Sequence, residues 1–453
     1  MGSKWTKTKL KDLGKIVTGK TPSSKINEPF SSQGVLFVTP RDMKGQRWIV
    51  QTERYLSDDG LKAIKNSFIP KGSIAVSCIG SDMGKANIIK SDAVTNQQIN
   101  SIIVDKSKHD PLFIYYSLSL MQEYFKSIAS GSATPILNKN DFSECEIDIP
   151  SKESQITISS FLDVLDSKVE INNKINQTLE KISQTLFKSW FVDFDPVIDN
   201  ALDAGNPIPE ALQSRAELRQ KVRNSTDFKP LPTDVRALFP TEFEETELGW
   251  VPKGWSIENF SEIAQLVKEN VKSEAISTYV HYVGLEHLER KHIFITNYGN
   301  GSDVSSNKTA FSKGDLLFGK LRPYFHKVAI TPFSGICSTD ILVFRAKKKY
   351  YKSLMAMYAF TDEFVAYANL RSTGTRMPRA EAKDLLKYKI VLPNENILEK
   401  FELLLNDYWS KGQLNNNENK QLTALRDTLL PKLISGELSL EDLPDLIKQT
   451  EAA

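Results

Sequence analysis

Cysteine is scarce in this chain of 453 residues, which contains only Cys78, Cys145 and Cys337. The three lie far apart and form no CxxC pair, so a disulfide scaffold or a zinc ribbon is not expected and a reducing cytoplasm fits. No apolar run approaches the roughly 18 residues that a membrane span requires. The first residues lack the apolar stretch of a signal peptide. We therefore expect a cytoplasmic protein that makes no use of a membrane.

Motifs for catalysis are also missing. The chain has no Pro-Pro dipeptide, so the tetrad of an amino-methyltransferase is absent, and it has no GxSxG nucleophile motif. Residues 80–86 have the wrong spacing for a P-loop. His281, His287 and His292 match neither HExxH nor a zinc finger. Asp193 and Asp195 follow a predicted helix and are interpreted as part of a turn. We expect no catalytic residue, no metal site and no cofactor in this chain.

Charge is unevenly distributed along the sequence. Residues 1–150 contain 20 Lys and Arg against 15 Asp and Glu, and residues 251–393 contain 21 against 13. The remaining segments contain 17 against 28, so two basic blocks alternate with two acidic ones. Solvated surfaces alone explain such a pattern as readily as function does. The functional interpretation is two polyanion-binding domains joined by segments that do not touch the polyanion.

The sequence also repeats itself. Lys71–Val76 resembles Lys313–Phe318 at an offset of 242 residues, and Ile171-Asn172-Asn173 matches Leu414-Asn415-Asn416 at an offset of 243. A nearly constant offset over a hundred residues predicts two copies of one unit, each a basic globular part followed by a helix. Strand-like patterns, for example at 74–79 and 279–283, alternate with helix-like patterns at 112–127 and 351–368. The predicted fold class is α+β with two similar mixed domains.

The helix of each copy has a heptad-like apolar seam that is interrupted by polar residues at the same place in both. Each helix could instead lie along its own domain. At about 1.5 Å per residue, however, about 35 residues of helix reach ~50 Å, which exceeds the width of such a domain. We therefore predict that the helices form an intramolecular antiparallel coiled coil. The predicted helix-pairing residues are Ile158, Phe161, Leu165, Asn172, Ile175, Leu179, Ile182, Leu186, Phe401, Leu404, Tyr408, Asn415, Leu422, Leu425 and Leu429.

These patterns divide the chain into six parts. The predicted parts are a first domain at 1–150, a helix at 151–191, a connector with several prolines at 192–250, a second domain at 251–393, a second helix at 394–436 and a mobile acidic tail at 437–453. Within the connector only a short helix, at residues 211–222, is predicted.

Several strings resemble one family, the specificity subunits of type I restriction-modification systems. The string at 176–197 is similar to their central conserved region, and the string at 425–438 is similar to their C-terminal conserved region. Residues 247–255 look like the entry to their second target-recognition domain. Family-like strings inside the domains are Thr95–Asn100, Cys337–Ile341 and Gly374–Pro378. The first domain has Gly131–Pro135 where the second has Gly374–Pro378, without the arginine, so an arginine role there is carried over only to Arg376.

The resemblance implies a function without chemistry of its own. Such a subunit binds an asymmetric bipartite site in double-stranded DNA, with one half-site for each target-recognition domain, and its coiled coil sets the length of the unread spacer. Two methyltransferase (modification) subunits, which carry S-adenosylmethionine, dock on the helices. Restriction subunits, which are ATP- and Mg-dependent translocases, join that core.

Loops beside the predicted strands are expected to contact DNA, because phosphate contacts need Lys or Arg and base edges need polar side chains. The predicted DNA-binding residues are Thr39, Arg41, Lys85, Gln97 and Thr134 in the first domain and Lys320, Arg322, Tyr324, Thr339 and Arg376 in the second. Two alternatives remain open from the sequence: a coiled-coil scaffold whose basic domains bind RNA or protein, and an enzyme with an unrecognised active site.

Overall fold

The computed structural model describes residues 5–80, 82–130, 135–374, 376–439 and 441. The chain divides into two compact units, one of residues 1–169 with 420–453 and one of residues 170–419. Each unit contains one domain with β-sheets and part of two long helices, α5 (Lys152–Phe191) and α12 (Glu395–Ser435). No helix in the described ranges has the length and apolar character needed to cross a bilayer.

The first domain (residues 5–150) contains two five-stranded sheets, β2-β11-β8-β9-β5 and β3-β6-β4-β10-β7, and an antiparallel pair β1-β12 that joins its two ends. Its strands are β1 (Thr6–Lys9), β2 (Gly14–Thr18), β3 (Phe30–Ser31), β4 (Val35–Val38), β5 (Trp48–Ile49), β6 (Tyr55–Leu56), β7 (Phe68–Ile69), β8 (Ile74–Ser77), β9 (Ala86–Ile89), β10 (Ala93–Thr95), β11 (Ile99–Val104) and β12 (Glu146–Ile149). Its helices are α1 (Asp58–Ala63), α2 (Pro111–Ser119), α3 (Gln122–Ile128) and α4 (Lys139–Glu144).

The second domain (residues 251–393) contains two four-stranded sheets, β16-β23-β20-β21 and β17-β19-β22-β18, and the pair β15-β24. Its strands are β15 (Ser256–Asn259), β16 (Ala264–Leu266), β17 (Asn270–Val271), β18 (Tyr282–Val283), β19 (Lys308–Phe311), β20 (Leu316–Gly319), β21 (Val328–Ile330), β22 (Gly335–Cys337), β23 (Ile341–Ala346) and β24 (Lys389–Leu392). Its helices are α9 (Lys352–Ala359), α10 (Asp362–Leu370) and α11 (Ala382–Leu385).

The two domains share one topology. Antiparallel β11-β8-β9 in the first corresponds to β23-β20-β21 in the second, and parallel β4-β10 corresponds to β18-β22. Strands β11 and β23 each span six residues, at 99–104 and 341–346, so they lie 242 positions apart. The prediction of two similar mixed domains is confirmed.

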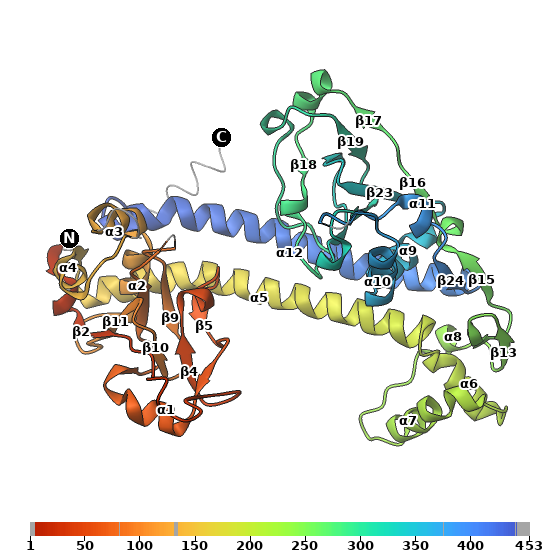
Figure 1. Cartoon of the computed structure of the whole chain (residues 1–453), viewed down its shortest axis with the longest axis horizontal. Coiled ribbons are helices and arrows are strands. Elements are labelled where there is room, and N and C mark those ends of the chain that lie inside the picture. The colour runs from red at the N-terminus through yellow and green to blue at the C-terminus, as the bar shows by residue number, and fades with distance from the viewer. Residues whose placement is uncertain (1–4, 81, 131–134, 375, 440, 442–453) are drawn as a thin grey trace. The chain divides into compact units, whose positions relative to one another are not determined.

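The long helices pair in opposite directions. In the second unit, Asn172 Nδ2 donates to Asn419 Oδ1 at 2.9 Å, and Trp409 Nε1 donates to Ser183 Oγ at 3.2 Å. The partner on α12 moves towards lower numbers as α5 moves towards higher ones, and Phe187 meets Phe401 further along (Figure 1). The antiparallel two-helix coiled coil is therefore confirmed.

The interruption in the seam is a buried layer of amides. Asn176 Nδ2 donates to Asn416 Oδ1 at 2.7 Å and to the Gly412 carbonyl at 3.1 Å, and Asn415 Nδ2 donates to Asn176 Oδ1 at 2.9 Å. The Asn172 amide donates to Glu418 and Asn419 rather than to Asn415. Because sliding one helix along the other would leave these buried amides without partners, the layer favours a single register.

The seam differs from the prediction at three positions. Ile175 is 36% exposed, Ile182 41% and Leu425 45%, so these side chains lie on the outer faces of their helices. Polar Asn176 and Ser183, one residue further along, are buried in their place, because hydrogen bonds across the pair satisfy them. Of the other predicted pairing residues, Ile158, Leu165, Asn172, Phe401, Asn415 and Leu429 are buried, and Phe161, Leu179, Leu186, Leu404, Tyr408 and Leu422 are half-buried.

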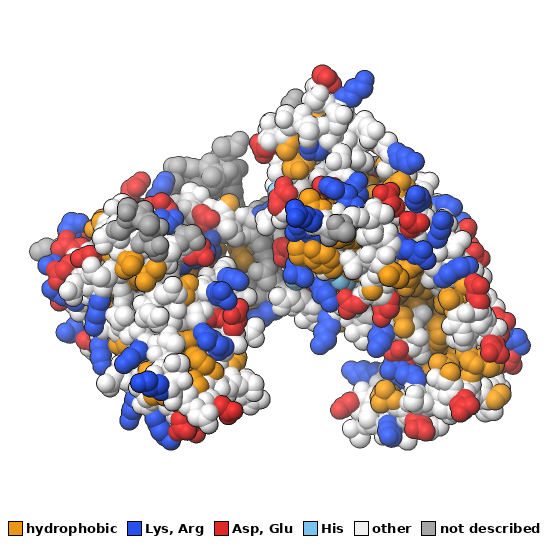
Figure 2. Space-filling model, viewed as in Figure 1, with side chains coloured by type: hydrophobic (Ala, Val, Ile, Leu, Met, Phe, Trp, Pro, Cys, Tyr) orange, Lys and Arg blue, Asp and Glu red, His pale blue; other side chains and the backbone are white. Residues whose placement is uncertain are grey.

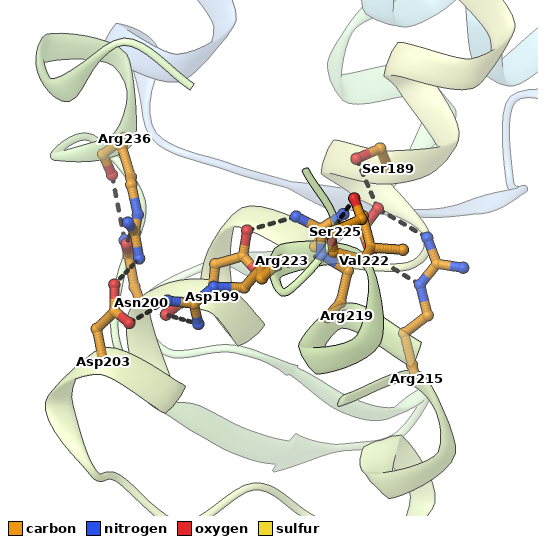
Figure 3. A network of polar contacts seen from close by, with 11 residues as sticks. Ser189, Asp199, Asn200, Asp203, Arg215, Arg219, Val222, Arg223, Ser225 and Arg236 are labelled. Carbon is orange, nitrogen blue, oxygen red and sulfur yellow. Dashed lines mark hydrogen bonds and ion pairs between the residues drawn. The ribbon is translucent and has the colours of Figure 1, made fainter. Parts of the chain in front are cut away.

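The connector contains more regular structure than predicted. Its elements are α6 (Asp195–Ala204), α7 (Gln213–Arg223), α8 (Thr233–Arg236) and a hairpin of β13 (Phe243–Thr246) and β14 (Gly249–Pro252). A ladder of ion pairs ties α6 to α7 (Figure 3). Arg215 binds Asp195 through two hydrogen bonds of 2.7 Å, Arg219 binds Asp199, and Arg223 binds Asp203. The spacing of four residues on both helices puts all these charges on facing sides, which gives Asp195 a structural role.

Three further boundaries differ from the sequence predictions. The helices predicted at 112–127 and 351–368 are each split in two, and Thr361 shows why, because its hydroxyl accepts from the Phe364 amide and starts a new helix, α10. The strand predicted at 279–283 is reduced to Tyr282–Val283 because residues 273–278 form a 3₁₀ helix. The predicted mobile tail lies outside the described residues from 442 onwards.

Candidate nucleic-acid interface

Two loops meet at one edge of the second domain. The turn after β20 runs through residues 320–326, and the loop after α10 folds back on itself where Thr373 and Arg379 exchange backbone hydrogen bonds of 3.1 and 3.0 Å. The Arg322 amide donates to the Pro378 carbonyl at 2.8 Å, and the Ala380 amide donates to the Lys320 carbonyl at 3.0 Å. These backbone bonds hold the two loops together as one surface.

This surface brings together all five DNA-binding residues that were predicted in the second domain. Lys320, Arg322 and Tyr324 lie on the turn, and Arg376 lies on the folded loop. Thr339 joins them because the Lys320 amide donates to the carbonyl of the next residue, Asp340, at 3.0 Å. We call these five residues the second-domain cluster.

Exposure and charge within the second-domain cluster suit a polyanion. Tyr324 is 46% exposed, Thr339 and Arg376 are exposed, and Lys320 and Arg322 are half-buried. The nearby acidic side chain, Asp340, pairs with Arg379 at 3.2 Å. The surface therefore presents cations to solvent while its nearby carboxylate is neutralised.

The corresponding edge of the first domain is built in the same way. The Cys78 amide donates to the Gln98 carbonyl at 2.8 Å, and the Leu137 amide donates to the Cys78 carbonyl at 2.9 Å. The Asn96 amide donates to the Val38 carbonyl at 2.9 Å, which places the loop after β4 beside the loop after β10. Thr39 and Gln97 therefore lie close together, whereas Thr134 lies outside the described residues.

Several predicted residues of the first domain already have partners. The Thr39 amide and hydroxyl both donate to Asp42 at 2.8 Å, which fits a helix-capping role. Gln97 accepts from the Thr21 hydroxyl at 2.6 Å, and Lys85 pairs with Asp82 at 2.8 Å. Arg41 is exposed, so among the four described residues of this prediction its side chain is the most available for a phosphate contact. Figure 2 shows further Lys and Arg side chains spread over the visible face of both domains.

Arg379 was not among the predicted residues, although its backbone closes the folded loop and its side chain neutralises Asp340. Arg290 was also not predicted. Its Nε donates to the Phe325 carbonyl at 3.3 Å, and this contact supports the turn. The three arginines at 371, 376 and 379 lie close together in the sequence, and this clustering was a signal for Arg379. No sequence signal marked Arg290, because its partner is a backbone carbonyl 35 residues away.

The three cysteines and two of the histidines have structural surroundings. Burial raises the pKa of the Cys78 and Cys145 thiols to about 11 and that of Cys337 to about 12, so these thiols stay protonated at neutral pH. His281 stacks on Phe333 with ring centroids 4.1 Å apart, and His292 pairs with Glu180 at 3.0 Å. Across the described residues, no group of three or more potential ligands is arranged to hold a metal ion.

Comparison with known proteins points to one family. Residues 2–181 match the family model described as the type I restriction modification DNA specificity domain. This part of the chain is therefore similar to the DNA specificity domain of type I systems.

Named relatives extend this likeness to nearly the whole chain. The MjaIX specificity subunit of Methanocaldococcus jannaschii is 26% identical over 97% of this chain and 94% of its own length. The HindI specificity subunit of Haemophilus influenzae is 26% identical over 89% of this chain and 94% of its own length. The crystal structure of a type I S subunit from M. genitalium shares the fold, with a TM-score of 0.54 at 16% identity over 95% of this chain and 96% of that one. The resemblance to type I specificity subunits is confirmed.

Proposed function

We propose that this chain is the DNA sequence-specificity subunit of a type I restriction-modification complex. The observation that carries the proposal is the similarity to named specificity subunits over 97% of the chain. Two loop clusters of the same construction, one at an edge of each domain, supply the matching physical requirement. A bipartite site needs two reading surfaces, and a tandem repeat provides them.

The two reading surfaces are built alike but carry different side chains. Backbone hydrogen bonds fix the described parts of the loops, while the loop sequences differ, as between Gly131–Pro135 and Gly374–Pro378. Since base edges are read by side chains and phosphates by cations, the shared scaffold positions the protein and the differing loop sequences read different bases. Each domain would then recognise its own half-site, and the complete DNA site would be asymmetric.

Chemistry is assigned to partner subunits. We assign S-adenosylmethionine to two modification subunits, and ATP and Mg to restriction subunits, so that this chain is not an enzyme and acts in the cytoplasm. The outer side of α5 offers a docking surface, because Ile171 is 52% exposed and Ile182 41%. A shallow groove of about 710 Å³, lined by residues between Lys174 and Ser189, lies on the same helix. Exposed apolar residues of this kind are typical of a surface that a partner covers.

The decisive experiment maps methylated adenines across the genome of cells that carry or lack the gene for this chain, with its modification subunits present in both. We expect one asymmetric bipartite motif to be methylated only when the chain is present. A parallel binding assay with purified complex should show preference for duplex DNA of that motif and a steep loss of affinity with salt. Unchanged methylation on deletion, or preferred binding to RNA, would refute the proposal.

The spacer length gives a second prediction. Inserting seven residues beside Lys174 in α5 and seven beside Asn417 in α12 preserves the heptad seam and adds about 10 Å of helix, at 1.5 Å per residue. Since base pairs are about 3.4 Å apart, the preferred spacer should grow by about 3 bp. Inserting seven residues in α5 alone is the control, and it should abolish methylation because the amide layer loses its register. An unchanged spacer in the double insertion would show that the helices do not set its length.

A further inference from the structure

The turn that carries Arg322 has an unusual backbone. Arg322 has φ 52° and ψ 65°, and His326 has φ 52° and ψ 54°, so both residues adopt the left-handed conformation. Side chains with a Cβ disfavour this region, and a residue that precedes proline, as Arg322 precedes Pro323, is restricted further. Non-glycine residues that are held in such conformations concentrate at functional sites.

The first domain makes the equivalent turn with glycine. Gly80 and Gly84 lie 242 positions before Arg322 and His326, and their φ values are 90° and 84°. Glycine adopts positive φ without steric cost, so the shape of the turn does not itself require arginine or histidine. The side chains at 322 and 326 therefore need a separate explanation.

His326 has a structural explanation. It is 4% exposed, its Nε2 lies 2.9 Å from the Phe360 carbonyl oxygen, and its Nδ1 lies 3.2 Å from Asp362 Oδ1. Its ring also packs against Phe360 with centroids 5.0 Å apart. The histidine thus fastens the turn to the corner between α9 and α10.

Arg322 has no such explanation. Its Nε is buried, and no acceptor in the described part of the chain lies within hydrogen-bonding distance of it. Asp340, whose backbone carbonyl accepts from the Lys320 amide, pairs through its side chain with Arg379. At the equivalent Gly80 an added Cβ would meet nothing within 4 Å, so crowding does not explain why the first domain has glycine there. Tyr324, 46% exposed, stands beside it.

We propose that Arg322 is a specificity-determining residue that recognises a guanine in the half-site bound by the second domain, a role that rests on the function proposed above. An arginine fork can donate to the O6 and N7 atoms of guanine together, which no other base offers in the major groove. The strained turn holds the start of the side chain fixed, so less conformational freedom is lost when the fork meets the base. The first domain has no arginine at this position and must read its half-site with other residues.

Substitution of Arg322 distinguishes a role in base recognition from a role in folding. Arg322→Gly restores the residue that the first domain uses, so the thermal midpoint should stay the same or rise by about 2 °C. Methylation mapping with the complete complex should show that one fixed guanine of one half-site becomes degenerate, with discrimination falling about 10- to 100-fold. The other half-site should be unchanged. A folded Arg322→Gly complex that keeps every fixed base would overturn the proposal.

Two further variants sharpen the test. Arg322→Lys keeps the charge but loses the fork, so it should lose the same guanine, whereas a lysine variant that retains the guanine would make Arg322 a phosphate contact and overturn the proposal. Lys291→Gly is the matched control, because Lys291 is an exposed cation of the same domain with φ 57°. It should leave the motif intact. If the unaltered complex yields no bipartite motif at all, the proposed function fails, and that result is distinct from a failure at Arg322 alone.

Discussion

Replacing Phe401 with alanine is expected to destabilise the second unit by about 3–5 kcal/mol, the cost of removing a fully buried aromatic side chain. Phe401 is 0% exposed and lies against Phe191 and Trp190, with ring centroids 4.8 and 5.8 Å apart. The substitution removes these contacts and leaves a cavity where α12, α5 and the second domain share one core. Denaturant unfolding of the full chain, followed by the fluorescence of Trp190 and Trp255, measures the loss.

Leu414→Ala is the matched control on the same helix. Leu414 is 63% exposed, so its truncation should change stability by less than about 0.5 kcal/mol. Comparable losses in the two variants would contradict the prediction, because they would show that burial in the shared core does not set the stability of α12. An unchanged unfolding midpoint in Phe401→Ala would show that the domain is stable independently of its packing on the helix.

Replacing Asp166 with alanine should cost the first unit about 3 kcal/mol, because it breaks a buried charge network. The Asp166 side chain is 10% exposed, and its carboxylate accepts from the Tyr116 hydroxyl at 2.8 Å and from Arg426 Nη1 at 2.6 Å. Burial, and next the Asp166 charge, raises the pKa of Tyr116 well above its ordinary value, so the phenol remains a donor. Without Asp166, the Tyr116 hydroxyl and the Arg426 guanidinium lose their shared acceptor.

Asp427→Ala provides the comparison for Asp166. Asp427 binds the same arginine at 2.7 Å but its side chain is 59% exposed, so its loss should cost at most about 1 kcal/mol. A double-mutant cycle of Asp166→Ala with Tyr116→Phe isolates the buried hydrogen bond, and a coupling energy near zero would contradict the network. Thermal unfolding of the full chain at several salt concentrations measures both effects.

Much of the fold could be predicted because periodicity and repetition are properties of the sequence itself. The long helices begin and end within one residue of the predicted positions, at 152–191 and 395–435. The residues of the seam were harder to predict, because α5 carries a second apolar stripe through Ile171, Ile175 and Ile182 on its outer face. Apolar spacing cannot tell which stripe faces a partner helix, and hydrogen bonds allowed Asn176 to take the buried position.

The sequence indicated which loops form the candidate interface, but not how these loops are arranged in space. Strings such as Gly374–Pro378 indicated which residues to consider, and the backbone hydrogen bonds of Arg322 and Thr373 show how they come together. The left-handed backbone at Arg322 could not be read from its residue type, because arginine rarely adopts it. Comparing the two repeats position by position, with Gly80 opposite Arg322, would have suggested it.

The first unit contains residues from both ends of the chain. Leu429, Leu430 and Leu433 near the end of α12 share a core with Leu162 and with Phe113 of the first domain, and Gly436 lies so close to Trp5 that an added Cβ would come within 2.4 Å of its ring. The core of the first domain therefore cannot be completed before residues 429–433 of α12 have been synthesised. A premature stop that removes α12 would leave an unfinished core in a domain far ahead of the stop, and would expose that domain to chaperones and proteases.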